Sequence, residues 1–197
     1  MTPKIWHLVL LTGAIVSLAA CSKTDAPSSA KSDSHVLSKS ASPDDSIASA
    51  ESAAPAKIGR GAAIVVPEAN GSMKTLRAGT NGWTCMPDVP STPGPDPMCW
   101  DANAGKWLDT WMAHKAPPAG LVGVIYMLAG GSDAGNTDPY ADKPHQGEDW
   151  VTTGPHIMIV GSKEVLTGYP RGVKPDTSVP YVMWDGTPYA HLMVPVR

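Results

Sequence analysis

The chain has 197 residues, of which 42% are hydrophobic and 6% aromatic, so its length suits one domain of ordinary size. Twenty prolines and 19 glycines, without a collagen-like period, argue against a helical bundle and favour short strands joined by turns. The formal charge of −3 leaves no basic stripe, which removes nucleic acid from the expected partners.

The first 20 residues have the pattern of a signal peptide. Lys4 supplies a positive charge, Leu8 to Ala20 form a short and mostly apolar segment, and small residues follow. This apolar segment is shorter than the roughly 20 residues that span a bilayer as a helix. We therefore predict a leader at residues 1–20 rather than a membrane helix or a buried core helix.

The run Leu18-Ala19-Ala20-Cys21 resembles the lipobox of bacterial lipoproteins. The resemblance implies cleavage before Cys21 and attachment of a diacylglycerol and a further acyl chain, such as palmitate, to that residue. Two or more acyl chains hold a protein stably at a membrane. Because Ser22 stands where inner-membrane retention signals of enterobacteria usually place Asp, we expect anchoring in the outer membrane, facing the periplasm. Inner-membrane anchoring stays open.

The segment that follows the lipobox has a biased composition. Residues 22–57 contain 11 serines, many alanines and mixed charges, with no aromatic residue and no apolar periodicity. Such a segment buries too little apolar surface to offset the entropy of ordering it. We expect residues 21–57 to form a lipidated, disordered tether and residues 58–197 to form one globular domain.

Apolar patterns and turn signals predict the elements of that domain. Strands are expected at 62–67 and 73–77, joined by a turn at Asn70-Gly71. One helix is expected at 102–114, where apolar residues recur at helical spacing. Four further strands are expected, at 121–128, 157–160, 181–184 and 192–196. One principal helix against a small, mainly antiparallel sheet gives an α+β fold with Pro/Gly-rich loops.

Two cysteines remain once Cys21 is acylated. In an oxidising compartment the even pair Cys85 and Cys99 indicates a disulfide. Five prolines lie between them, so we expect neither a helix nor a central strand in that segment. A metal site would need further ligands, and a redox pair would more often be spaced C-x-x-C.

Several segments of the second half share a pattern with other proteins: residues 81–88, 93–99 and 132–140, with Gly-Pro-His and Pro-Tyr-Ala-His near the end. Through these segments, the part of the chain from about 81 to 197 resembles a set of uncharacterised bacterial exported proteins. The resemblance implies a shared domain and nothing about its chemistry.

A repeated His-x-Met motif is the most specific pattern that could bind a ligand. His156 and Met158 stand at the start of one predicted strand, and His191 and Met193 at the start of another. Strand side chains alternate, so each pair shares a face, and neighbouring strands would bring all four together. Thioether and imidazole suit Cu(I), which predicts a copper site if one ion can contact all four. The alternative is structural, because Met commonly fills cores and His often bonds only to the backbone.

An acidic, glycine-rich loop offers hard oxygen ligands. It carries Asp133, Asn136, Asp138 and Asp142, which suit Ca²⁺. The loop lacks the spacing and the closing Glu of an EF-hand. Asx turns in an ordered surface loop explain the same residues.

Enzyme signatures are absent: there is no G-x-S-x-G, H-E-x-x-H, P-loop or Rossmann motif. A dispersed site would need a pocket in which a histidine contacts a carboxylate, with candidates His114, His145, His156 or His191 and Asp133 or Asp138. A third alternative is an envelope module that binds a protein or glycan partner through exposed Trp83, Trp100 or Trp184. We expect a non-catalytic binding or structural domain, with copper as its most specific candidate ligand.

Overall fold

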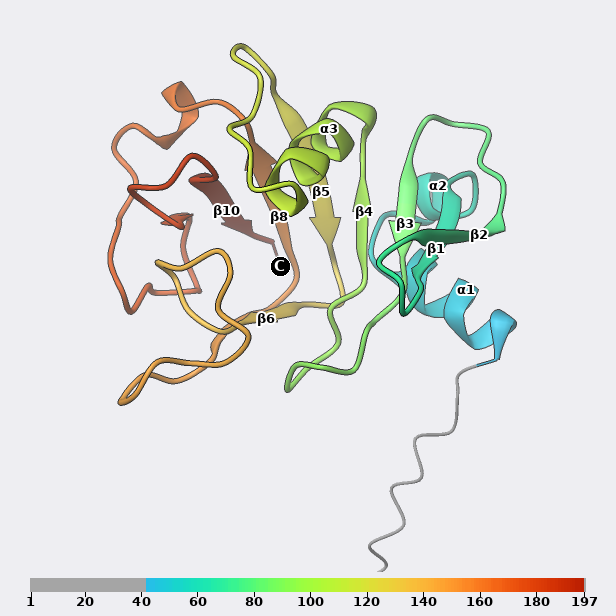
Figure 1. The fold of residues 1–197 in the computed structure, drawn as a ribbon, viewed down its shortest axis with the longest axis horizontal. Coiled ribbons are helices and arrows are strands. Elements are labelled where there is room, and N and C mark those ends of the chain that lie inside the picture. The colour runs from blue at the N-terminus through green and yellow to red at the C-terminus, as the bar shows by residue number, and fades with distance from the viewer. Residues whose placement is uncertain (1–41, 197) are drawn as a thin grey trace, which may run out of the picture. The chain divides into compact units, whose positions relative to one another are not determined.

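Residues 42–196 are described in a computed structural model of the chain, and Figure 1 shows their fold. The predicted leader, Cys21 and the first part of the predicted tether lie outside the described residues. Within 42–196, no helix is both long and apolar enough to cross a lipid bilayer.

The described chain begins with helix α1 (Pro43–Ser52), which the short helix α2 (Ala56–Gly59) follows. A capping box starts α1. The Ser42 hydroxyl accepts from the Asp45 N–H, and the Asp45 carboxylate accepts from the Ser42 N–H. Three small residues after the first turns are buried against the sheet: Ala50, Ala53 and Ala54.

The globular domain therefore starts near residue 42 rather than at 58, and α1 falls in the segment for which we predicted a disordered tether. Composition misleads here because serine and alanine are typical both of linkers and of a capped helix that packs closely. Each alanine buries little apolar surface, but its small side chain lets the helix backbone pack closely against the sheet.

Eight short strands form the main sheet. They are β1 (Ala63–Pro67), β2 (Met73–Arg77), β3 (Thr84–Met86), β4 (Met98–Trp100), β5 (Gly123–Met127), β8 (His156–Val160), β9 (Tyr181–Met183) and β10 (His191–Pro195). Their order is β2-β1-β3-β4-β5-β8-β10-β9, and every neighbouring pair is antiparallel except β1 and β3. Strands β6 (Gly131–Asp133) and β7 (Val151–Thr153) form a separate antiparallel pair, and a 3-10 turn, η1 (Glu164–Leu166), precedes β9.

The predicted mixed α+β fold with a mainly antiparallel sheet is confirmed, whereas the prediction of a small sheet was wrong. Strands β3 and β4 were not predicted, because each is short and the adjoining prolines, Pro87 and Pro97, indicated a loop. They lie in the middle of the sheet and join the N-terminal hairpin to the strands β5, β8, β10 and β9.

The predicted disulfide is confirmed. Cys85 and Cys99 stand directly opposite each other on β3 and β4 and are bonded. The proline-rich residues 87–97 between these strands contain no helix or strand. The disulfide therefore closes a loop whose backbone has little regular hydrogen bonding of its own.

Helix α3 (Ala102–Met112) packs on the face of the sheet opposite to α1. Because side chains alternate along β4, Met98 and Trp100 face α3 while Cys99 faces α1. Gly123 at the start of β5 permits close approach, since a Cβ there would collide with the backbone of Ala104. Figure 1 shows α3 across β4 and β5, with α1 and α2 near β1 and β3.

Candidate ligand pocket

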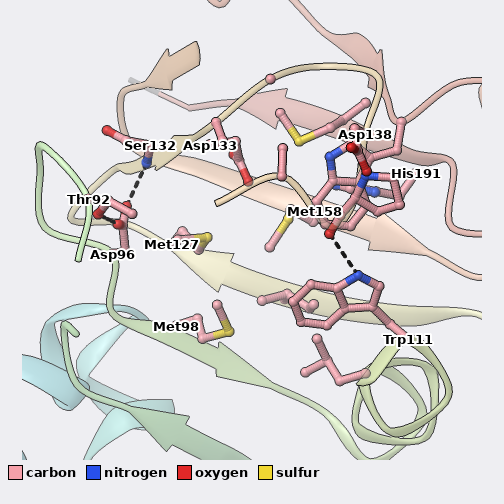
Figure 2. A pocket seen from close by; sticks show the side chains of 18 of the residues that line it. Thr92, Asp96, Met98, Trp111, Met127, Ser132, Asp133, Asp138, Met158 and His191 are labelled. Carbon is pink, nitrogen blue, oxygen red and sulfur yellow. Dashed lines mark hydrogen bonds between the residues drawn. The ribbon is translucent and has the colours of Figure 1, made fainter. Parts of the chain in front are cut away.

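A cavity of about 400 Å³ lies on the α3 face of the sheet. Thioethers and one isoleucine from four strands form its apolar floor: Met98, Ile125, Met127, Met158 and Met183. Tryptophans from α3 and from the surrounding loops form its walls: Trp107, Trp111, Trp150 and Trp184. Figure 2 shows the labelled thioethers lying together beneath the polar side chains of the cavity. This volume and lining are typical of sites for small organic molecules.

The loop between β6 and β7 closes one side of the cavity and is fastened to α3. The Trp111 indole N–H donates to the Pro139 carbonyl at 3.1 Å, as Figure 2 shows, and the Tyr140 hydroxyl donates to the Trp111 carbonyl at 3.0 Å. The rings of Trp111 and Tyr140 stack with centroids 6.2 Å apart. The loop therefore has a defined position over the cavity.

Asn136 ties the same loop to strand β9. Its side-chain amide donates to the carbonyls of Gly172 and Val182, at 2.6 and 3.1 Å, and its backbone carbonyl accepts the Trp184 N–H at 2.8 Å. Trp184 adopts a φ of 55°, a left-handed conformation that costs energy for a bulky residue. The loop and the strained backbone together hold the Trp184 indole against the cavity.

Asp96, from the proline-rich loop, forms one polar end of the cavity. Its carboxylate accepts the Ser132 N–H at 2.6 Å and the Thr92 hydroxyl. Burial raises the pKa of Asp96 to about 6, and the nearby charge of Asp88 acts in the same direction, while the bond from Ser132 opposes them.

Asp133, one residue beyond Ser132, lines the cavity beside Asp96. Asp133 is partly exposed, Figure 2 shows its carboxyl group directed into the cavity, and no hydrogen-bond donor of the described chain contributes to its pKa. Burial, together with the nearby charge of Asp96, raises the pKa of Asp133 to about 7. The cavity therefore contains a carboxyl group that no protein donor within 42–196 neutralises.

His191 lies at the other end of the cavity, between two tryptophans. Its ring centroid is 4.9 Å from that of Trp184 and 5.5 Å from that of Trp107. Its Nδ1 is 3.0 Å from the Tyr189 carbonyl, and its buried Nε2 has no partner among the described residues. Burial, with a smaller contribution from the charge of His156, lowers the pKa of His191 to about 4, while the bond to the Tyr189 carbonyl opposes them. The imidazole is therefore neutral at pH 7.

The two indole groups beside His191 are also unpartnered. The Nε1 atoms of Trp107 and Trp184 are buried and make no hydrogen bond within the described part of the chain. Buried polar atoms in folded proteins are nearly always paired, so each exception needs an explanation. A bound molecule or water with polar groups would supply the missing partners.

The His-x-Met residues share one face of the sheet, as their alternation predicts. Strands β8 and β10 are antiparallel neighbours, and Met158 stands directly opposite Met193. His156 is opposite Pro195, so the two histidines lie at opposite ends of the paired region rather than side by side. That one ion binds all four side chains stays a prediction.

Three of the four residues proposed for calcium, Asp133, Asp138 and Asp142, line the same cavity. Asp133 faces the cavity, and the amide nitrogen of Asn136 is bonded to backbone carbonyls. Asp138 also accepts the Tyr140 N–H at 2.9 Å. Within residues 42–196, no three His, Cys, Asp or Glu side chains come together as a metal site. Calcium binding stays a prediction without an assembled ligand set.

The enzyme interpretation requires a histidine and a carboxylate in hydrogen-bond contact inside a pocket. The histidine–carboxylate contact found among the described residues joins His145 Nε2 to Asp138 at 3.8 Å, and both side chains are exposed. His114 instead stacks on Tyr140, with ring centroids 4.0 Å apart. A dispersed catalytic site stays a prediction.

The tryptophans considered for an envelope partner are partly buried. Trp83 packs against Tyr126 on the α1 face, with centroids 5.4 Å apart, and Trp100 packs with the α3 core. Trp184 lines the cavity. Binding of a protein or glycan partner through these side chains stays a prediction.

Sequence reasoning missed Asp96 and the role of the thioethers Met98, Met127 and Met183. They come from a loop and three strands that are far apart in the sequence, and only the strand order brings them together. The sequence holds no local signal for this grouping. Asp133 is among the residues proposed for calcium and for a dispersed catalytic site, but its place beside Asp96 in an apolar cavity was not predicted.

Comparison with protein-family models, with curated proteins and with solved structures finds no match for this chain. What the pocket binds therefore has to be inferred from its own residues.

Proposed function

We propose that this chain is a lipid-anchored protein of the bacterial cell envelope. Its domain would bind a small organic molecule that carries an ammonium group on an apolar body. The lipobox-like run ending at Cys21 and the Cys85–Cys99 disulfide support the location. The cavity on the α3 face supports the binding role.

The unpartnered carboxyl group of Asp133 is the observation that carries the proposal. A carboxylate inside an apolar cavity is costly unless a cation or hydrogen-bond donors neutralise it. Asp96, already bonded to Ser132, adds a second negative group nearby. A ligand cation beside Asp133 would relieve both the desolvation of the carboxylate and its repulsion from Asp96.

The rest of the lining fits the same class of ligand. Four tryptophans contact the cavity, and aromatic faces attract organic cations by about 0.5–2 kcal/mol each. The methionines offer a flexible, polarisable surface to the apolar part of the ligand. His191 Nε2, as a lone-pair acceptor, can receive a hydrogen bond from a ligand N–H or O–H.

Three compounds of similar size test the charge preference: 2-phenylethylamine, 2-phenylethanol and 3-phenylpropionate. We expect the amine to bind at least tenfold more tightly than the alcohol, and the carboxylate not to bind. Calorimetry on the full chain measures affinity, and tryptophan fluorescence reports occupancy of the cavity. Equal affinity for all three compounds, or no binding of the amine, contradicts the proposal.

An Asp133→Asn variant identifies the group responsible. We expect it to bind the amine and the alcohol with similar affinity, because the amide keeps the size of the side chain and removes its charge. Asp109→Asn is the matched control, since Asp109 lies on the exposed side of α3. A control that loses the preference for the amine equally would contradict a specific role for Asp133.

The membrane anchor has its own test. Cells that express the chain should incorporate labelled palmitate into it, and a Cys21→Ala variant should lose both the label and membrane association. Membrane association without the label would contradict lipid anchoring at Cys21.

A further inference from the structure

The two His-x-Met motifs share a local geometry that the sequence does not reveal. Each histidine is the first residue of its strand, and its Nδ1 lies against the carbonyl of the residue two positions earlier. The distances are 2.7 Å from His156 to Gly154 and 3.0 Å from His191 to Tyr189. Both histidines are only 1% exposed.

This geometry determines which ring nitrogen of each histidine has a lone pair available to a ligand. A carbonyl oxygen can only accept, so Nδ1 carries the hydrogen in each neutral ring, and Nε2 has a lone pair. Both Nε2 atoms are buried and have no partner among residues 42–196. A histidine that binds a metal typically has this arrangement, with its other ring N–H donated to a carbonyl.

Two thioethers adjoin His156. Met127 stands directly opposite on β5, and Met158 follows two residues later on the same face. A Cβ at Gly131 would lie 2.8 Å from the Met127 methyl and 3.3 Å from His156 Cε1. The end of the Met127 side chain and Cε1 of the imidazole therefore lie against the same small residue.

The second motif repeats this arrangement on the next pair of strands. Met183 stands directly opposite His191 on β9, and Met193 follows two residues later. Met193 also stands opposite Met158, so the two sets are adjacent across the sheet. All four methionines are at most 9% exposed.

We propose that each His-x-Met motif, completed by the methionine opposite its histidine, binds one Cu(I) ion, giving two sites per chain. One imidazole nitrogen and two thioethers suit a soft monovalent ion such as Cu(I) better than they suit Ca²⁺, Mg²⁺ or Zn²⁺. The register favours two sites over a single shared one, because it separates the histidines. The cavity gives access, since Met127, Met158, Met183 and His191 line it. This inference does not depend on amine binding.

Titration of the full chain with Cu(I) against a colorimetric Cu(I) chelator, in ascorbate, counts the bound ions. The chain carries Cys21→Ser, because a free thiol would itself bind copper. We expect two equivalents. Met127→Leu should remove one and Met183→Leu the other, since leucine keeps the volume and removes the sulfur. Met112→Leu, at an exposed methionine, should remove none.

Tryptophan fluorescence separates the two sites. An ion at His191 would lie beside Trp107 and Trp184, so its binding should quench emission. Met183→Leu should abolish the quenching, whereas Met127→Leu should retain it. Thermal unfolding of each variant verifies that its fold is intact.

Three results overturn the inference: no bound copper, two equivalents that survive both substitutions, or one equivalent that either substitution abolishes. The last would indicate a single shared ion. The copper titration tests the two Cu(I) sites, and the calorimetry with 2-phenylethylamine tests amine binding. A negative result in one experiment does not decide the other proposal.

Discussion

The two faces of the sheet differ in how completely their polar groups are paired. On the α1 face, alanines, Ile64 and the Cys85–Cys99 disulfide pack together, and Arg77 bonds to Glu51 and to the carbonyls of Gly59 and Ala62. Five buried side-chain nitrogen or oxygen atoms lack a partner in the described chain. Four belong to tryptophans and histidines on the α3 face, and the fifth to Asn136 in the loop beside the cavity.

This difference indicates a division of roles. A paired, small-residue face contributes stability, whereas unpaired buried polar groups reduce stability and are retained where a ligand uses them. We therefore expect substitutions on the α1 face to change unfolding without changing binding. On the α3 face, removing an unpaired group should weaken binding and can even stabilise the fold.

Loss of the disulfide should give the largest effect. Replacing Cys85 and Cys99 together with alanine frees a loop of about 15 residues in the unfolded chain, which lowers the free energy of unfolding by about 3 kcal/mol. Urea unfolding measures this change. Because the loop between the cysteines carries Asp96 into the cavity, we expect a small loss of affinity for 2-phenylethylamine. The preference for the amine over 2-phenylethanol, which depends on Asp133, should stay the same, and its loss would break the separation between the faces.

Asp133→Asn should stabilise the domain at high pH by roughly 2 kcal/mol, a value reduced to allow for the partial exposure of the carboxyl group. The pKa of Asp133 is raised from 3.8 to about 7 in the folded state, so between these values the folded chain holds a proton that the unfolded chain has lost. The stability of the unsubstituted protein therefore falls as pH rises from about 4 to 7.

Unfolding of the two proteins across this range tests the sign. The histidines contribute equally to both, so the difference between the proteins isolates Asp133. It should grow in favour of Asp133→Asn up to about pH 7 and then level off. A difference that does not change with pH would contradict a raised pKa of Asp133 in the folded state.

Amine affinity should depend on pH in the opposite direction. An ammonium ligand requires the ionised form of Asp133, whose pKa is about 7, so affinity should fall roughly tenfold from pH 8 to pH 6. Asp96, with a pKa of about 6, would steepen the loss below pH 6, while His191 stays neutral. Calorimetry at several pH values gives the profile, and a flat profile in Asp133→Asn is the control.

The smallest effect should come from the N-terminus of α1. Ser42→Ala removes the side-chain partner of the Asp45 N–H, which typically lowers the free energy of unfolding by about 1 kcal/mol. Thermal or urea unfolding measures it. No change would indicate that α1 adds little to the domain, which would weaken the contrast between the faces.

Elements that depend on neighbouring residues in the sequence are predicted well. The hairpin of β1 and β2, the helix α3, the disulfide and the shared face of His156 and Met158 all follow from spacing, turns or alternation. The capping box at Ser42 and Asp45 was not predicted, because the composition of residues 22–57 favoured a linker.

The site itself depends on what local patterns leave open. Alternation puts His191 and Met193 on one face but does not give the register that separates His191 from His156. Asp96 joins Asp133 only because the proline-rich loop folds beside β6. Pairings between distant segments are set by tertiary packing, which a single sequence does not determine.

The most direct test of the account is a structure of the domain with 2-phenylethylamine bound. We expect the ammonium group within hydrogen-bond distance of the Asp133 carboxylate and the phenyl ring among the tryptophans of the cavity. An amine bound elsewhere on the chain, or bound in the cavity with its ammonium group directed away from Asp133, would contradict the account.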